Sequence, residues 1–230
     1  MKMQKLGGYS AIASICLLVA VIAIAVPFAV RYGLNQPNAG LDPAKVAAAY
    51  SGAPMTVWAA SILEFLGSIF GILVVLALYE RMQAKAPYLM RLLVIAASIS
   101  CALTILGIMM GIRCMASMAG DADISIYKPF LVMQSGLSAA SNNVSGWVAL
   151  LLGAAALSTR ALPRFIGWVF LILGILGVIG FTFPNLQGAT GLVVLIVAGL
   201  FYAVSTIWLG VVLLRSQEAA PAKTMAAQAG

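Results

Sequence analysis

The sequence contains no histidine, and only 8% of its 230 residues are charged. Without histidine, the chain offers no bis-imidazole haem site, no imidazole zinc site and no Ser-His-Asp triad. Its three cysteines, Cys16, Cys101 and Cys114, lie in apolar segments without a Cys-x-x-Cys pair, so we interpret them as buried small hydrophobic residues. There is also no phosphate-binding loop and no nucleotide fingerprint. We therefore expect no enzyme activity, no catalytic residues and no cofactor other than lipids.

Hydrophobic residues, in contrast, make up 63% of the chain. A helix of about 20 apolar residues crosses the hydrocarbon layer of a membrane, and inside that layer the backbone must satisfy its own hydrogen bonds. The sequence therefore predicts an all-α integral membrane bundle of six transmembrane helices within residues 1–215, followed by a disordered tail over residues 216–230. The expected spans are 8–30, 56–80, 90–118, 129–158, 165–183 and 192–214. Asp42 and Pro43 additionally predict the start of a short helix that runs to about Tyr50.

The formal charge of +7 is distributed over short loops, which argues against a nucleic-acid partner. Six spans place both termini on one side of the membrane. That side holds nine basic residues and the other holds four. The nine are Lys2, Lys5, Arg81, Lys85, Arg91, Arg160, Arg164, Arg215 and Lys223, and the four are Arg31, Lys45, Arg113 and Lys128. Because basic loops stay in the cytoplasm, we expect both termini on the cytoplasmic side of a bacterial inner membrane.

Glu64 is a carboxylate inside the apolar 56–80 span. At 3.6 residues per turn it shares one face of that helix with Ala60, Gly67 and Gly71. The spacing Gly67-x-x-x-Gly71 favours close approach of another helix. An ionised Glu64 against lipid would cost a few kcal/mol or more, so we expect this face to point into the bundle.

The 129–158 span carries a polar stripe made of Gln134, Ser138, Ser141, Asn142 and Ser145. Asn142 lies at a similar depth to Glu64, and Arg113 lies near the outer end of the preceding span. One interpretation is an outward-facing polar pocket with Glu64 at its floor and Arg113 at its rim. The other is a hydrogen-bonded clasp of Glu64, Arg113 and Asn142 that holds the helices in register.

Two further patterns each have a packing interpretation. Met110, Cys114 and Met118 recur every four residues and could bind Cu(I), although Met and Cys also fill gaps between apolar helices. Gly167, Gly174, Gly177 and Gly180 in the 165–183 span indicate close helix packing.

Several stretches resemble a family of bacterial multi-pass membrane proteins that is known only as a domain of unknown function. They are LEFLGSIFGILVVLALYERM, YLMRLL, STRALPRFIGWVFLILG and IWLGVVLLR. The resemblance implies an acidic residue in the second span, matched by Glu64, and an Arg at the start of the third, matched by Arg91. It also implies a Ser-x-x-x-x-Pro-Arg turn, matched by Ser158, Pro163 and Arg164. The resemblance supports the architecture and implies no mechanism.

Two functions follow from these patterns. The small loops and the Gly-rich and Ala-rich faces favour a non-enzymatic accessory or assembly protein, which would bind other membrane subunits or a second copy of itself. The alternative is a carrier or channel for a small solute or ion that uses a pocket around Glu64.

Overall fold

A computed structural model describes the backbone of residues 3–36, 38–118, 123–182 and 189–215, and their side chains except those of 180–182 and 189–198. The regular elements in these ranges are all helical. In chain order they are α1 (Met3–Arg31), η1 (Ala39–Leu41), α2 (Pro43–Gly52), α3 (Pro54–Met82), α4 (Pro87–Met118), η2 (Ile124–Tyr127), α5 (Lys128–Thr159), α6 (Arg164–Thr182) and α7 (Ala189–Arg215). The all-α prediction is therefore confirmed, whereas the predicted tail lies outside the described residues.

Four of the described segments are long and apolar enough to cross a membrane: α1, α3, α4 and the stretch Ile124–Thr159 that contains α5. Each contains one of the first four expected spans and extends slightly beyond it. In α6 and α7, the parts with described side chains, Arg164–Ile179 and Gly199–Arg215, are apolar but shorter than a full span. The class of membrane bundle is thus supported by these four helices, and the number of six crossings stays a prediction.

Residues at the ends of the helices explain where several of them begin. Asp42 accepts a hydrogen bond from the Ala44 amide at 3.0 Å, and Pro43 is the first residue of α2, so the predicted short helix is confirmed. Asp123 accepts bonds from the amide and hydroxyl of Ser125 before η2. These bonds stabilise the carboxylate form and lower the pKa of Asp123.

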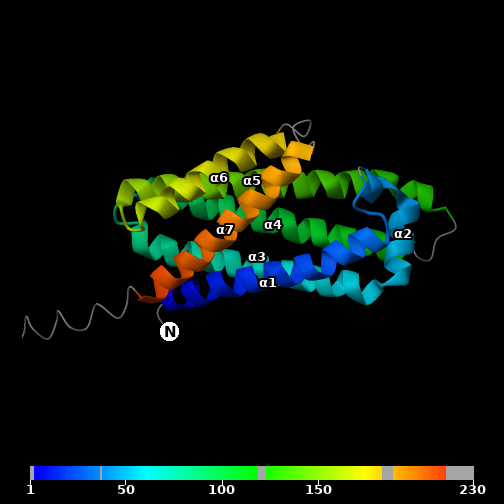
Figure 1. The fold of residues 1–230 in the computed structure, drawn as a ribbon, viewed down its shortest axis with the longest axis horizontal. Coiled ribbons are helices and arrows are strands. Elements are labelled where there is room, and N and C mark those ends of the chain that lie inside the picture. The colour runs from blue at the N-terminus through cyan, green and yellow to red at the C-terminus, as the bar shows by residue number, and fades with distance from the viewer. Residues whose placement is uncertain (1–2, 37, 119–122, 183–188, 216–230) are drawn as a thin grey trace, which may run out of the picture.

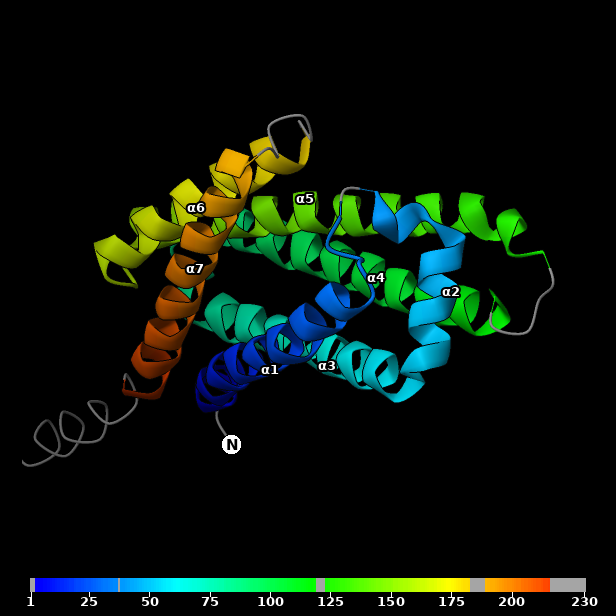
Figure 2. The ribbon, with the colours of Figure 1, turned by 45° about the vertical axis from the view of Figure 1, so that its right-hand side comes forward.

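The long helices pack in the order α1–α3–α4–α5–α6, and α7 crosses obliquely to contact both α6 and α1 (Figures 1 and 2). The N-terminal end of α1, the C-terminal end of α7 and the turns after α3 and α5 all lie at one end of the bundle, here called the turn end (Figure 1). At the opposite end, α2 lies across the bundle (Figure 2) and is here called the cap.

The main hydrophobic core lies toward the turn end. Leu78, Met82, Met90, Leu93 and Leu213 are fully buried there. The turns themselves are joined by two hydrogen bonds, from Arg81 to the Ala161 carbonyl at 3.0 Å and from Lys85 to the Thr159 carbonyl at 3.4 Å. A second, smaller cluster of Val46, Cys114, Met118 and Leu131 packs beneath the cap. Between these two clusters the helices leave open space.

Glycines bring α5 and α6 into backbone contact, as the Gly-rich pattern predicts. A methyl group at Gly153 would lie 2.5 Å from the Leu171 nitrogen, and one at Gly146 would lie 2.8 Å from the Val178 nitrogen. Gly174 likewise faces the backbone of Leu150. Space for a side chain is missing at each of these positions, so α5 and α6 form a tightly packed pair.

The other predicted glycine contact is wrong. An added methyl group at Gly67 or at Gly71 would meet no atom within 4 Å. These glycines line open space inside the bundle instead of a neighbouring helix. The spacing correctly indicates an inward face, but periodicity alone does not reveal whether a helix or a cavity lies opposite.

Candidate binding cavities

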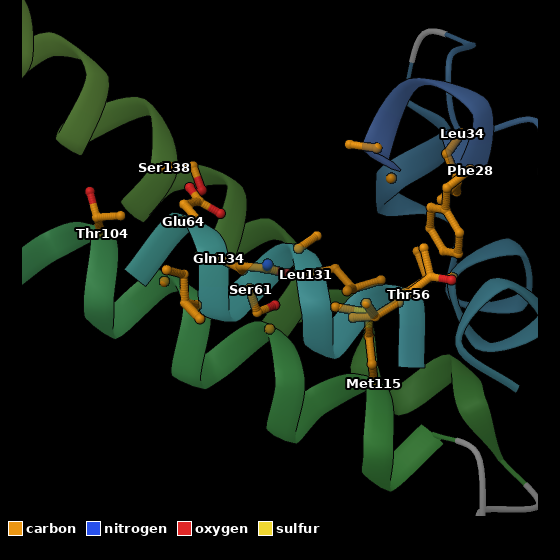
Figure 3. A pocket seen from close by; sticks show the side chains of 18 of the residues that line it. Phe28, Leu34, Thr56, Ser61, Glu64, Thr104, Met115, Leu131, Gln134 and Ser138 are labelled. Atoms are coloured by element: carbon orange, nitrogen blue, oxygen red, sulfur yellow. The ribbon is translucent and has the colours of Figure 1, made fainter. Parts of the chain in front are cut away.

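A cavity of about 360 Å³ lies between α1, α3, α4 and α5, beneath the cap (Figure 3). We call it the outer cavity. Its polar lining combines the end of α3 nearest the cap, one threonine of α4 and the polar stripe of α5. The residues are Thr56, Ser61, Glu64, Thr104, Gln134, Ser138, Ser141 and Asn142. Five predicted site residues, Glu64 and four members of the stripe, therefore line one cavity.

A second cavity of about 440 Å³ continues from there toward the turn end. We call it the inner cavity. Its walls are mostly apolar and come from α1, α3, α4, α5, α6 and α7. Ser145, the remaining member of the predicted stripe, lines this cavity together with Gly67 and Gly71. The described residues that line both cavities are Glu64 and Thr104.

Glu64 lies on the face of α3 opposite Ile62, Leu66 and Ile69, which expose their apolar side chains on the outside of the bundle. The structure places no hydrogen-bond donor or cation of the described chain on its carboxylate. Ser68 donates to the backbone carbonyl of Glu64 at 3.1 Å, which is a contact within the helix. The carboxylate thus faces the space shared by the two cavities and remains available to a ligand.

Arg113 does not take part in this site. Its side chain is exposed, it lines neither cavity, and within the described residues it forms no ion pair with Glu64. Of the two interpretations, the pocket describes the positions of Glu64 and the polar stripe better than the clasp does. The rim of the outer cavity is formed by the cap and its connection to α1, through Leu34, Gly40 and Val46.

Hydroxyl groups form the polar contact between α4 and α5. The Ser100 and Ser145 hydroxyls are 2.7 Å apart, and those of Thr104 and Ser141 are 2.6 Å apart. Ser141 also donates to the Ser100 carbonyl at 3.1 Å. We call these four residues the hydroxyl clasp. Sequence reasoning missed Ser100 and Thr104, although their spacing of four residues inside an apolar helix places them on one face.

The sulfur-containing residues at the cap end of α4 serve packing. Cys114 and Met118 are buried in the cluster beneath α2, together with Val46 and Leu131. Met110 does not belong to this cluster. The described part of the chain contains no group of three His, Cys, Asp or Glu residues suited to a metal. Copper binding through Met110, Cys114 and Met118 stays an untested prediction.

Comparisons of the chain with protein-family models, with curated proteins and with solved structures find no match. The resemblance to a family of bacterial membrane proteins therefore stays a prediction.

Proposed function

We propose that the chain is a membrane carrier or channel for a small solute or ion, and that the solute binds at Glu64. One observation carries this proposal: an acidic residue without a partner in the described chain borders two successive cavities. Intramembrane carboxylates are costly and are found mainly along ion and substrate pathways. The proposal selects the transport alternative over the accessory role.

The dimensions of the two cavities fit a route across a membrane. Along α3 their linings extend from Thr56 to Leu78. At 1.5 Å per residue this stretch is about 33 Å long, close to the thickness of the hydrocarbon layer. Beyond Leu78 the path is closed by the buried side chains of Met82, Met90 and Leu93. A continuous space that is closed at one end by packed side chains is the arrangement expected of a carrier in an outward-facing state.

We further propose six crossings of a bacterial inner membrane with both termini in the cytoplasm. The turn end carries Arg81, Lys85, Arg160, Arg164 and Arg215, the excess expected of a cytoplasmic face. The ends of α1 and α7 lie there together, which agrees with an even number of crossings (Figure 1). In this orientation the outer cavity opens away from the cytoplasm.

Flux measurements in proteoliposomes test the transport proposal. The purified protein is reconstituted and assayed with labelled rubidium, sodium, chloride and methylammonium ions under an imposed membrane potential. We expect flux of at least one of these solutes, and its loss in Glu64→Gln. Glu80→Gln is the matched control, because this substitution makes the same chemical change on the same helix. Glu80 lines neither cavity.

A stability measurement accompanies the flux assay. Because Glu64 has no partner in the described chain, we expect Glu64→Gln to melt at the same temperature as the wild type or higher. Flux that is absent from the wild type, or unchanged in a folded Glu64→Gln protein, would contradict the transport proposal. A marked drop in melting temperature would instead indicate that Glu64 serves as a clasp.

The accessory role keeps one supporting observation. Gly136, Ala139 and Ala140 form an exposed small-residue face on α5, and a methyl group at Gly136 would meet no atom within 4 Å. Such a face suits another membrane helix, from a different subunit or a second copy. Co-purification of a stoichiometric partner that is lost in Gly136→Leu would support this role, and a monomer after mild extraction would oppose it.

A further inference from the structure

We propose that the ligand of this site is an organic cation with an apolar body, whose charged head binds Glu64 and whose body occupies the inner cavity. This inference rests on the proposed function, because it names the class of solute that the same site would accept. It follows from the charge, the lining and the size of the two cavities.

The charge of the site selects a cation. Among the described residues that line either cavity, Glu64 is the one that carries a formal charge at neutral pH. No lysine or arginine of this lining offsets it. An ionised carboxylate in surroundings of low dielectric constant attracts a positive charge much more strongly than it would in water, and repels an anion equally.

The lining beyond Glu64 selects an apolar body. Toward the turn end the inner cavity is bordered by aliphatic side chains, among them Val74, Leu78 and Leu152. Phe170 and Tyr202 also border it, with their rings edge to face and 6.2 Å between centroids. A hydrated inorganic ion gains nothing from such walls, whereas a hydrocarbon group of a ligand gains about 25 cal/mol for each Å² removed from water.

The volumes agree with a ligand of this class. Cavities of about 360 and 440 Å³ lie within the range of roughly 300–1,000 Å³ typical of sites for small organic molecules. The open space at Gly67 and Gly71 contributes to the inner cavity next to Glu64, on the side of the turn end. These glycines therefore keep room for the ligand next to the carboxylate that binds its head.

Binding of tetraphenylphosphonium, a permanent cation with an apolar surface, tests the inference. The full-length protein in lipid nanodiscs is titrated with the labelled cation, and empty nanodiscs correct for partitioning into lipid. We expect saturable binding that weakens at least tenfold in Glu64→Gln and stays unchanged in Glu80→Gln. Gly67→Leu, which would fill the inner cavity, should also weaken binding, whereas Gly136→Leu should not.

Lowering the pH provides a second readout. A cation binds the ionised carboxylate, so protonation of Glu64 must compete with the ligand and affinity must fall as the pH falls. The other titratable residues lining the cavities, Cys101 and Tyr202, stay neutral at acidic pH. Tetraphenylphosphonium itself does not titrate. Binding should therefore become independent of acidic pH in Glu64→Gln.

Failure of this inference is distinguishable from failure of the transport proposal. Wild-type protein that does not bind tetraphenylphosphonium saturably, or binds it equally well in Glu64→Gln, overturns the inference. If rubidium or sodium flux still depends on Glu64 in that case, the transport proposal survives and the solute is an inorganic ion. Conversely, Glu64-dependent binding without flux of any tested solute, tetraphenylphosphonium included, supports the binding site and overturns transport.

Discussion

Four hydroxyl groups, and not the carboxylate, form the polar contact between α4 and α5. Ser100 lies at the centre of this clasp, because its hydroxyl is 2.7 Å from that of Ser145 and 3.3 Å from the Ser141 carbonyl. Hydrogen bonds between membrane helices contribute about 0.6 kcal/mol each on average, with larger values near ~1.7 kcal/mol. At the residue scale, the stability of the α4–α5 contact should therefore depend on Ser100 more than on Glu64.

The first prediction concerns Ser100→Ala. We expect it to lower the free energy of unfolding by about 1–2 kcal/mol, since two contacts between helices are lost together. Thermal or SDS-induced unfolding of the purified protein measures this change. Ser158→Ala is the matched control on α5, because among the described residues the Ser158 hydroxyl bonds only to the Ala155 carbonyl of its own helix. Equal effects of the two substitutions would contradict the clasp.

The residue types in the sequence predict which helix faces point inward at this site, but not which groups contact one another there. The charge of Glu64 and the periodicity of the α5 stripe were sufficient to predict which faces point inward, because lipid excludes polar groups so strongly. The partners of those groups could not be predicted. The position of Arg113 near the outer end of its helix allows its side chain either to reach down to Glu64 or to turn outward to the interface, and the sequence does not decide between the two. Ser100 was overlooked because a single hydroxyl is tolerated on any face of a membrane helix.

At the scale of elements, α5 and α6 form a pair with little room between their backbones. A methyl group at Gly153 would lie 2.5 Å from the Leu171 nitrogen and 2.8 Å from the Gly167 carbonyl oxygen. These are backbone atoms, which cannot rotate away as a side chain can. The helices themselves would have to move apart to accept any side chain.

The second prediction is that Gly153→Ala destabilises the bundle. Inserting a methyl group into a well-packed contact costs typically ~1–3 kcal/mol. Gly136→Ala on the same helix is the control, because it meets open space and Ala favours a helix over Gly by about 1 kcal/mol. The two glycine-to-alanine changes should therefore shift the melting temperature in opposite directions. A neutral Gly153→Ala would show that α6 is not held against α5 as described.

Helix starts and small-residue faces could be predicted because they depend on neighbours in the sequence. Asp42 with Pro43 is an example, since capping needs only the next few residues. The side-by-side order of helices depends on which faces fit one another in space, and the sequence pattern does not contain that information directly. For this reason Gly67 and Gly71 were assigned a helix partner, although they line the inner cavity.

At the scale of the whole molecule, packing differs between the two ends of the bundle. The turn end holds the main core and the two hydrogen bonds from Arg81 and Lys85 that join its turns. The cap end holds a small cluster and the outer cavity. In the orientation proposed above, the packed turn end faces the cytoplasm and the outer cavity lies on the other side of the membrane.

The third prediction tests that orientation by cysteine labelling in intact cells. The three native cysteines are first replaced by alanine, and single cysteines are then introduced at Lys45 on the cap and at Gln83 in the turn after α3. Both positions are exposed. We expect a membrane-impermeant thiol reagent to label Lys45→Cys in intact cells, and to label Gln83→Cys only after the cells are broken. The opposite pattern would reverse the topology and place the outer cavity on the cytoplasmic side.

The same cysteine-free protein can be used to test whether the outer cavity contains water. Ser61 lines this cavity one turn of α3 closer to the cap than Glu64, whereas Ile62 faces outward among apolar side chains. A small charged reagent reacts with a thiolate, and thiolates form only where water reaches the sulfur. Ser61→Cys should therefore react from outside the cell, and Ile62→Cys should not, although the two residues are adjacent in the sequence. Protection of Ser61→Cys by tetraphenylphosphonium would show that the ligand and the reagent share one route to Glu64, and equal reactivity at both positions would show that no such route exists.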